Sequence, residues 1–502
     1  MRGRAAEWRE VEERGWDVLV VGGGATGLAC GLDAASRGAC TLVVERGDLG
    51  QGTSSRSTKL IHGGVRYLRQ GDVGLVRESL RERGWFLRQA PEIVHWLRFV
   101  IPCYGRGEGW FYGLGMGVYD RLAGADGGAR SRRLGMEEVL EEVPGCREEG
   151  LRGGVLYEDG QFDDAAMLVC MRRTILREGG RVLTQAEVTG VFREGGRVAG
   201  VRVRDRLTGV TGVVRARVVI NAAGVYSDEI RRMGDGGAER RIAASQGIHV
   251  VLDGSWLGGG TALMIPRTED GRVLFAIPWM GKTLLGTTDR LVAATDGEPM
   301  PAAEEVGYLL RHGGRMFHRV PEVGDVRSVF AGLRPLISGR KGMASAKLRR
   351  DFEVERTARG MVSVFGGKWT TCRRMAEVAV DAAWSEAGLA RAECRTGRLE
   401  LVRLAGRDVR GGGVRLHEGL SLTREDVVMA VEQDGAWRVE DVLGRRSRAL
   451  QLDLRASAEV AEAVARIMAD RLGGDERWVE RECQAVREGV ARMEAMLAEV
   501  AQ

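Results

Sequence analysis

The chain has 502 residues, of which 44% are hydrophobic and 29% are charged, so it can bury a core large enough for two or three domains. Its 75 Lys and Arg against 70 Asp and Glu leave a net charge of +5, too small a bias to indicate a nucleic-acid-binding protein. The 74 glycines and 9 prolines are scattered along the chain, which excludes a collagen-like repeat and a proline-rich linker.

The cysteines and the N-terminal segment indicate in which cellular compartment the protein is expected. The eight cysteines show no CxxC pair and no metal-ligand spacing, so we expect reduced thiols, no metal site and a cytoplasmic protein. Residues 1–15 form a charged leader without the apolar centre of a signal peptide. No apolar run reaches the roughly 18 residues that a membrane-spanning helix needs, which leaves peripheral membrane contact open.

The first predicted elements form a strand–helix–strand unit. The valine-rich run WDVLVV at 16–21 predicts a strand that stops at glycines. The residues ATGLACGLDAASR at 25–37 favour a helix, and the apolar run TLVVE at 41–45 predicts a second strand. This is the arrangement in which a nucleotide-binding turn is expected between the first strand and the helix.

A GxGxxG motif lies at that turn. Gly22 permits a tight turn, Gly24 lets the backbone approach a pyrophosphate, and Gly27 lets the helix pack closely on the strand. The N–H groups at the start of the helix favour phosphate. Glu45 ends the second strand, where its carboxylate can accept hydrogen bonds from a ribose. Together these residues predict a bound dinucleotide.

The segment after the second strand indicates which dinucleotide is bound. An NAD-binding domain would continue with alternating strands and helices, but residues 52–64 read GTSSRSTKLIHGG, a polar loop suited to wrapping a longer ligand. No second strand-preceded GxGxxG occurs, so the chain offers one dinucleotide site. These two features favour FAD.

The rest of the chain changes character twice. Residues 241–289 alternate short apolar runs with Gly, Asp and Pro turns, which predicts antiparallel strands that form a substrate-binding sheet. From about residue 386 the pattern becomes helical. Thr423 and Asp426 stand at capping-box spacing, and residues 456–472 have helical apolar periodicity.

Four motifs, in family order, resemble the FAD-dependent glycerol-3-phosphate dehydrogenases, the quinone-linked enzymes related to glycerol-3-phosphate oxidases. They are GTSSRSTKLIHGGVRYL (52–68), IPWMGKTLLGTTD (277–289), AGLRPLI (331–337) and VFGGKWTTCRRMAE (364–377). The resemblance runs across roughly residues 16–385.

The resemblance implies an α/β fold. Its Rossmann-type FAD-binding domain would be discontinuous, with an antiparallel-sheet substrate domain of the D-amino-acid-oxidase or glutathione-reductase-2 type and a C-terminal helical domain. The expected ranges are 16–240 and 330–385 for the FAD-binding domain, 241–329 for the main part of the substrate domain, and 386–502 for the helical cap domain.

The resemblance also implies an activity. The expected reaction is oxidation of sn-glycerol 3-phosphate to dihydroxyacetone phosphate, with hydride transfer from C2 to flavin N5 and electrons passed to a membrane quinone. An oxidase that reduces O2 to H2O2, an amino-acid oxidase of the same fold, and a flavin-binding protein without catalysis are the alternatives. A homodimer, peripheral on the inner face of the cell membrane, is the expected assembly.

By resemblance, cations and histidines gather at the substrate. Cations hold a phosphate, and a histidine accepts a hydroxyl proton. His62 and His249 are both candidate bases and stay unranked, and Gln246 replaces a lysine of relatives, which removes a cation. The expected catalytic residues are His62, Arg66, His249, Arg334 and Lys368, and the expected substrate-binding residues are Arg66, Tyr67, Arg334, Arg350 and Lys368.

The expected cofactor-binding residues come from five stretches. A second helix start at 366–371 would turn its N–H groups toward the flavin ring, and the strand-to-helix turn in 218–230 would make another contact with FAD. The residues expected to bind FAD are Gly22, Gly24, Ala25, Thr26, Gly27, Glu45, Arg46, Thr53, Ser54, Ser55, Lys59, Leu60, His62, Ala223, Gly224, Gly367, Lys368, Trp369 and Thr370.

One segment has two interpretations. Residues 106–124, RGEGWFYGLGMGVYDRLAG, mix cations with large apolar side chains. They can rest in the interface of a bilayer, where a quinone is reached, or pack as an ordinary part of the core. The sequence leaves both readings open.

Overall fold

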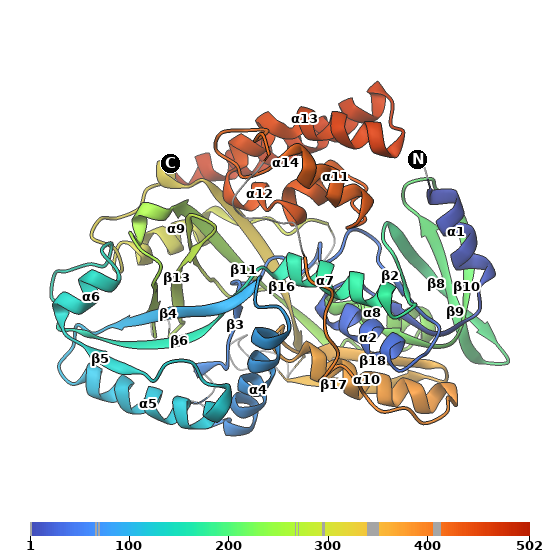
Figure 1. Cartoon of the computed structure of the whole chain (residues 1–502), viewed down its shortest axis with the longest axis horizontal. Coiled ribbons are helices and arrows are strands. Elements are labelled where there is room, and N and C mark those ends of the chain that lie inside the picture. The colour runs from blue at the N-terminus through green and yellow to red at the C-terminus, as the bar shows by residue number, and fades with distance from the viewer. Residues whose placement is uncertain are drawn as a thin grey trace.

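The computed structural model describes residues 3–501 except 66, 67, 69, 70, 267, 270, 294–296, 339–350 and 405–412. Two β-sheets lie side by side, and the C-terminal helices cover their upper edge in the view of Figure 1. The expected α/β fold with a C-terminal helical unit is confirmed.

The first sheet carries the predicted nucleotide-binding unit. Its strand order is β17-β18-β10-β1-β2-β7, and β1, β2, β7, β10 and β18 run parallel. The central strand β1 is valine-rich and its register pairs Val18 with Val218 and Val20 with Val43, as expected for a strand covered on both faces. The strands are β1 (Trp16–Val21), β2 (Thr41–Val44), β7 (Arg181–Leu183), β8 (Ala186–Glu194), β9 (Arg197–Asp205), β10 (Thr211–Asn221), β17 (Phe352–Ala358) and β18 (Met361–Gly366).

Helices cover the two faces of this sheet. On one face a large core joins α2, α7 and α10 to the sheet through small residues such as Ala29, Ala34 and Ala379, which let the helices approach closely. The charged leader forms a helix whose Trp8 and Val11 pack against strands of the opposite face. These helices are α1 (Arg4–Glu13), α2 (Ala25–Ser36), α7 (Asp164–Arg177), α8 (Ser227–Gly234) and α10 (Cys372–Ala387).

The second sheet is largely antiparallel and has the order β15-β11-β14-β13-β12-β4-β6-β3, with β16 paired to β11 and β5 to β6. Its long strand β11, near one edge of the sheet, pairs with both β14 and β16. The strands are β3 (Leu60–Ile61), β4 (Val94–Pro102), β5 (Arg132–Leu134), β6 (Gly154–Phe162), β11 (Ile242–Asp253), β12 (Ala262–Ile265), β13 (Leu274–Trp279), β14 (Lys282–Gly286), β15 (Arg290–Val292) and β16 (Ser328–Ile337).

The strand pairing differs from the expected domain ranges. β3 to β6 lie within the range 16–240 but pair in the second sheet, and β16 stays in that sheet beyond residue 330. The chain rejoins the first sheet at β17. Local alternation predicts a strand but not its partner, because register and neighbours depend on residues far away in the sequence. The second sheet therefore draws on two separate parts of the chain.

Helices cover both faces of the second sheet. The apolar core beneath β4 and β6 includes side chains of α4 and α5, which lie along the lower left of Figure 1. A second core joins the sheet to α6, α9 and the end of α14. The helices here are α4 (Val73–Gln89), α5 (Glu108–Ala123), α6 (Met136–Glu142) and α9 (Ala303–Gly313).

The C-terminal helices have their own apolar core. The predicted capping box is confirmed: Thr423 N–H donates to Asp426 Oδ2 over 2.9 Å, and Asp426 N–H donates to Thr423 Oγ1 over 3.3 Å. A π-helical turn at Asp441–Arg446 precedes the last three helices. The helices are α11 (Arg424–Glu432), α12 (Ala449–Leu452), α13 (Leu454–Leu472) and α14 (Glu476–Val500). Across the described ranges, no helix is long and apolar enough to cross a membrane.

Candidate active site

The nucleotide cradle lies at the carboxyl end of β1, where β10 continues the sheet on one side and β2 on the other. Such a switch point opens a crevice at the start of the following helix. Gly22 has φ 113°, and an added Cβ at Gly27 would lie 1.8 Å from Gly22 O. An added Cβ at Gly24 would lie 3.0 Å from Ser54 Oγ. Gly22 and Gly27 thus keep the turn tight and α2 close to it, Gly24 keeps the backbone bare where a pyrophosphate would approach, and Ala25 and Thr26 begin α2 beside them.

Glu45 closes the far side of the cradle. Its Oε2 accepts the Gly23 N–H over 2.6 Å and its Oε1 accepts the Gly47 N–H over 2.8 Å. Burial raises the pKa of Glu45, and these two hydrogen bonds oppose the rise. Next to it, the Arg46 guanidinium stacks 3.9 Å above the ring of Tyr226. The carboxylate therefore lies beside the glycine turn, where a ribose hydroxyl would be met.

The loop 52–64 connects the cradle to the second sheet. Ser54 Oγ accepts the Ala25 N–H over 3.0 Å, and Thr53 Oγ1 donates to Leu333 O over 2.5 Å. Trp369 Nε1 donates to Ser54 O over 2.8 Å. The loop is thus hydrogen-bonded to the start of α2, to β16 and to the turn before α10, three elements that are far apart in sequence.

Lys59 has a different place from the one expected. Its Nζ is fully buried and donates to Asp164 Oδ2 over 2.8 Å and to Ser55 O over 2.7 Å. Burial and the nearby Arg448 lower the pKa of Lys59 to about 7, against the pull of Asp164. The ammonium group is therefore turned into the protein. The Lys59 ammonium supports the loop from behind, and the expected contact of Lys59 with the cofactor stays a prediction for its backbone.

A network of buried charges that the sequence reading missed fixes the back of this loop. Arg448 donates to Ser55 O over 3.0 Å and to Asp164 Oδ1 over 2.7 Å, and Gln451 Nε2 also donates to Ser55 O over 3.0 Å. These residues belong to the C-terminal helical unit, nearly four hundred positions away from the loop. Only the excess of arginines in RRSR at 445–448 could have drawn attention to them.

A second set of buried charges joins the same two units. Asp48 accepts Arg446 over 2.6 Å and Arg445 over 2.5 Å, and the side chains of all three residues are at most 3% exposed. Arg445 also donates to Asp441 over 2.8 Å. Burial raises the pKa of Asp441 to about 7, whereas Asp48, between two guanidinium groups, has a pKa below its usual value despite its burial. The C-terminal helices are thus ion-paired directly to the segment that precedes the loop.

Arg334 and Lys368 approach the loop from two sides. The residue before Arg334 is Leu333, whose carbonyl oxygen accepts the hydrogen bond from Thr53. The residue after Lys368 is Trp369, whose indole N–H donates to Ser54 O. Arg334 donates to Thr288 O over 3.1 Å and to Thr287 Oγ1 over 2.9 Å, and its NH1 lies 3.7 Å from Asp289 Oδ1. An added Cβ on Gly247 would lie 2.1 Å from the same guanidinium. Arg334 is therefore held in one place, against a bare backbone.

Lys368 lies at the other side of the loop, against α4. Its Nζ is 3.4 Å from Ser79 Oγ, and its positive charge acts on the carboxyl of Glu78. Gly366 and Gly367 before it have φ values of 72° and 95°, and α10 begins at Cys372 rather than immediately after them. The turn therefore ends in a helix start, as expected, a few residues later than the motif.

The two candidate histidines have different environments. His249 is buried on β11, stacks on Phe330 and shares a 3.0 Å hydrogen bond between Nε2 and Thr58 Oγ1. Burial, followed by the charges of Lys59 and Arg334, holds the pKa of His249 well below its usual range. A protonated His249 is thus strongly disfavoured.

His62, by contrast, is half-buried in the loop beside the turn that carries Lys368. Its carbonyl accepts Thr370 Oγ1 over 3.4 Å. The next residue, Gly63, donates its N–H to Tyr119 Oη over 2.9 Å, and Tyr119 donates to Asp159 over 2.7 Å. The position of His62 is therefore set by α5 as well as by the turn before α10.

The remaining expected residues fall into three groups. Leu60 lies in β3 and pairs with Gln161, so it starts the strand that follows the loop. Ala223 and Gly224 form the turn after β10, at the same sheet edge as the glycine motif. Arg66, Tyr67 and Arg350 lie outside the described residues. Gln246 donates to Glu305 and to Met300 O, so its side chain faces α9.

Comparison with known proteins identifies the family. Residues 17–382 match the family described as "FAD dependent oxidoreductase", and residues 345–479 match the "C-terminal domain of alpha-glycerophosphate oxidase". The chain belongs to the FAD-dependent oxidoreductases. Within this family of oxidoreductases its relatives are glycerol-3-phosphate dehydrogenases, and FAD is the cofactor.

Named relatives show how far the likeness of this FAD-dependent oxidoreductase extends. It is 39% identical over 400 residues to the mitochondrial glycerol-3-phosphate dehydrogenase of Arabidopsis thaliana, covering 77% of this chain and 63% of that one. It is 40% identical over 382 residues to "Glycerol-3-phosphate dehydrogenase 2" of Mycobacterium bovis, covering 76% and 65%. The match thus spans less than two thirds of the length of these relatives.

A solved structure matches this oxidoreductase over nearly its whole length. The glycerol-3-phosphate dehydrogenase from Bacillus halodurans, complexed with FAD, superposes with a TM-score of 0.77 and 27% identity, and covers 97% of each chain. The α-glycerophosphate oxidase of Mycoplasma pneumoniae shares the fold, with a TM-score of 0.60 and 18% identity.

The residues present fit FAD. Gly22 has a backbone conformation that side chains rarely adopt, as the tight turn demands, and Gly27 leaves no space for a side chain where α2 packs against that turn. Glu45 stands beside the cradle, and Ser54 closes over the start of α2. The same loop leads to His62 and lies between Arg334 and Lys368. A cofactor that begins at the cradle and extends along the loop would therefore end among these side chains.

Proposed function

We propose that this oxidoreductase oxidises sn-glycerol 3-phosphate to dihydroxyacetone phosphate and passes the electrons to a membrane quinone. The observation that carries the proposal is the position of Arg334 and Lys368 at the two sides of the cofactor loop. Leu333 and Trp369, their chain neighbours, are hydrogen-bonded to Thr53 and Ser54. Two cations, one at each side of the loop that leads to His62, suit a substrate that carries a phosphate.

The cations and the histidines of the site have separate roles in the reaction. FAD, when bound, accepts the hydride from C2 at N5. Arg334, kept in place by Thr287 and Thr288, offers a planar fork to the phosphate, and Lys368 adds a point charge. His62 takes the hydroxyl proton, because burial, and then the charges of Lys59 and Arg334, lower the pKa of His249 and disfavour its protonated form. His249 instead stays neutral and orients Thr58 through the hydrogen bond between its Nε2 and Thr58 Oγ1.

The test of this function is reduction of the bound flavin. Purified protein, mixed anaerobically with glycerol 3-phosphate, should bleach its flavin absorbance, whereas D-amino acids should leave the absorbance unchanged and glycerol should bleach it only slowly. Bleaching by an amino acid alone would contradict the phosphate-binding role of the two cations.

Replacing Arg334 tests the phosphate contact. Arg334→Ala should retain its flavin spectrum and lose about 2 kcal/mol or more of transition-state binding for glycerol 3-phosphate, the order of a lost charge-assisted hydrogen bond. The slow oxidation of glycerol should stay within a few-fold of the parent, since glycerol has no phosphate. The measurement is kcat/KM for both substrates. Equal losses on both would move Arg334 from phosphate binding to the chemical step.

The electron acceptor has a second candidate. The match of residues 345–479 to the C-terminal domain of an α-glycerophosphate oxidase favours O2 as an alternative to quinone. Rates of flavin reoxidation by a soluble quinone and by air-saturated buffer separate the two. Reoxidation by quinone that is much faster than by O2 supports the dehydrogenase, and the reverse supports an oxidase that releases H2O2.

A peripheral contact with the membrane would bring the enzyme to its quinone. Exposed apolar residues of α5 support this: Trp110 and Phe111 are each 65% exposed and Leu114 is 70% exposed. Such residues on one helix suit the interface of a bilayer. Co-sedimentation with vesicles tests the contact, and Trp110→Ser together with Leu114→Ser should weaken it. A homodimer remains part of the proposal, and the mass in solution tests it.

A further inference from the structure

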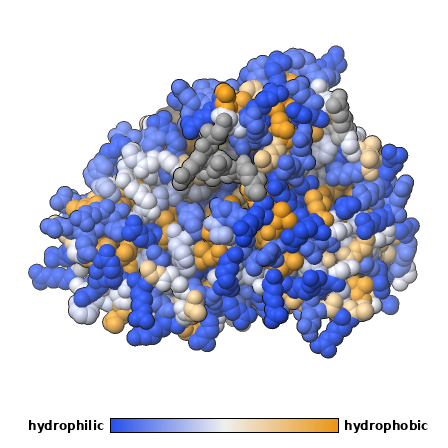
Figure 2. Space-filling model, in the orientation of Figure 1, coloured by the Kyte–Doolittle hydropathy of each residue, from blue (hydrophilic) through white to orange (hydrophobic). Residues whose placement is uncertain are grey.

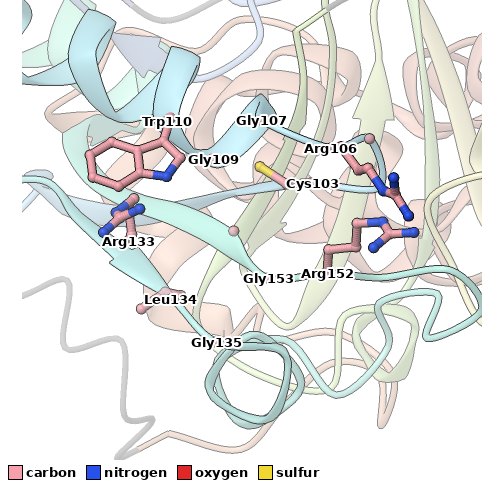
Figure 3. Close-up of a pocket in the computed structure, with 12 residues that line it drawn as sticks. Cys103, Arg106, Gly107, Gly109, Trp110, Arg133, Leu134, Gly135, Arg152 and Gly153 are labelled. Atoms are coloured by element: carbon pink, nitrogen blue, oxygen red, sulfur yellow. The ribbon is translucent and has the colours of Figure 1, made fainter.

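A cavity of about 470 Å³ opens beside the N-terminal turn of α5 (Figure 3). Its walls come from the segment before α5, from β5 and from the start of β6. Arg106, Arg133 and Arg152 line it, and none of its lining residues is a carboxylate. In Figure 3 the guanidinium groups of Arg106 and Arg152 lie next to each other, and Arg133 lies across the cavity beneath Trp110.

In the part of the chain that the structure describes, no carboxylate of the protein pairs with these arginines. Among the described residues none of the three makes an ion pair: Arg152 Nε donates to Tyr104 O over 3.0 Å, and Arg133 stacks 3.7 Å from the ring of Trp110. The nearest acid of α5, Glu108, accepts the N–H groups of Tyr104 and Gly105 and does not line the cavity. Like charges gathered without an anion of the protein call for an anion from outside.

The backbone adds to the positive character of the cavity. Gly107 and Gly109 line it at the start of α5, a helix of 16 residues whose first N–H groups have no partner within the helix. Cys103 lies at the floor, where burial raises the pKa of its thiol to about 11. The thiol is therefore neutral, and the cavity suits binding rather than thiol chemistry.

The exposed apolar side of α5 starts at the rim of the same cavity. Trp110 lines the cavity and is followed at helical spacing by Leu114 and Val118, which are 70% and 45% exposed. The face that Figure 2 shows is mainly hydrophilic, with hydrophobic residues in separate patches. An apolar helix side next to a cationic cavity is complementary to a layer that is apolar inside and carries phosphate at its surface.

We propose that this cavity binds the phosphodiester of an anionic phospholipid headgroup while Trp110, Leu114 and Val118 enter the acyl boundary. The inference rests on the membrane contact given under the proposed function and adds the ligand site that anchors and orients α5. The guanidinium forks of Arg106 and Arg152 bind the phosphate oxygens from one side and Arg133 from the other. A single headgroup would thus fix the rotation of the helix about its axis.

Filling the cavity without changing a charge is the sharpest test. An added Cβ at Gly109 would meet only Cys103 Sγ, at 4.0 Å, so Gly109→Leu should fill the cavity without a clash and with a gain in helix propensity. Gly115→Leu adds the same side chain to the same helix, where an added Cβ has nothing within 4 Å. With vesicles of phosphatidylcholine and phosphatidylglycerol, binding of Gly109→Leu should fall about tenfold, and that of Gly115→Leu should be unchanged or tighter.

Charge removal gives an independent comparison. Arg106→Ala with Arg152→Ala should weaken vesicle binding by about tenfold to thirtyfold, if each cation at an anionic surface contributes about 1 kcal/mol. The control is Arg121→Ala with Arg132→Ala, which removes the same charge from the end of α5 and from β5, outside the cavity lining. A diffuse attraction would give equal losses in the two pairs, and so would overturn the proposal.

Further outcomes separate the cavity from the function. If inorganic phosphate at constant ionic strength binds the parent but not Gly109→Leu, and vesicle binding is equal in both, the cavity takes soluble phosphate and the lipid assignment is wrong. If the parent does not bind vesicles that contain phosphatidylglycerol, both the membrane contact and the headgroup site are contradicted. Flavin reduction by glycerol 3-phosphate in solution should be the same in all these variants, so the catalytic proposal stands or falls separately.

Discussion

At the residue scale, Gly27 shows how one hydrogen atom in place of a side chain permits cofactor binding. An added Cβ would lie 1.8 Å from Gly22 O, within the turn that is predicted to hold the pyrophosphate. Gly27→Ala should therefore purify with little FAD and a lower melting temperature, since forced overpacking costs about 1–3 kcal/mol. Gly52→Ala is the control, because an added Cβ there has nothing within 4 Å. The flavin-to-protein absorbance ratio measures the FAD content of the two variants. Equal ratios in Gly27→Ala and Gly52→Ala would contradict the prediction that the turn at Gly27 binds FAD.

Gly247 offers a way to move Arg334 without removing its charge. An added Cβ would lie 2.1 Å from the guanidinium, which must then swing away from Thr287 and Thr288. Gly247→Ala should raise KM for glycerol 3-phosphate by about tenfold, a little under the loss in Arg334→Ala, and keep its flavin. Steady-state kinetics of both variants check this. A normal KM in Gly247→Ala would mean that the bound position of the guanidinium differs from the one described.

At the scale of the element, β11 carries a buried base whose titration opposes folding in acid. The unfolded chain protonates His249 near pH 6.5, whereas the folded chain resists protonation to a much lower pH. The unfolded state binds more protons below pH 6.5, so the stability that this neutral imidazole supports is present above pH 6.5 and is lost as the pH falls. The slope approaches about 1.4 kcal/mol per pH unit for one proton.

His249→Gln should remove that dependence. Glutamine keeps a group that can hydrogen-bond with Thr58 but does not titrate, so thermal midpoints should fall less steeply between pH 6.5 and 5 than those of the parent. Differential scanning calorimetry across this range gives the comparison. A parent and variant with parallel pH profiles would mean that water reaches the imidazole in the native protein.

At the scale of the whole molecule, the C-terminal helices support the cofactor loop through buried charges. Arg448 is buried and donates to both Asp164 and Ser55 O. Arg448→Met should cost about 3–5 kcal/mol, because one partner of a buried charge network is lost, and should release FAD at a lower temperature than the parent does. Flavin fluorescence during heating reports the release.

Its control is another arginine of the same helical unit. Arg455→Ala removes an exposed guanidinium that pairs with Glu494 at the surface, and should shift neither the flavin release nor the melting temperature appreciably. If both variants release FAD at the same temperature as the parent, the loop keeps its position without the C-terminal helices, and their role lies elsewhere.

The nucleotide-binding unit could be predicted from local sequence patterns. WDVLVV, the three glycines and the run TLVVE predicted β1, the cradle and β2, because the strand period, the bare turn and the helix start are properties of neighbouring residues. The capping box at Thr423 was likewise local and is confirmed. The family motifs extended this reading to FAD, which the comparisons bear out.

The residues that surround this unit are brought together only by folding. The pairing of β4 with β12 and with β6, the turn of Lys59 toward Asp164, and the donation of Arg448 to Ser55 all join residues that the sequence keeps apart. Strand partners and buried ion pairs depend on which surfaces meet when the chain collapses. The free energy of such a contact depends on both partners, so it cannot be predicted from the sequence of either segment alone.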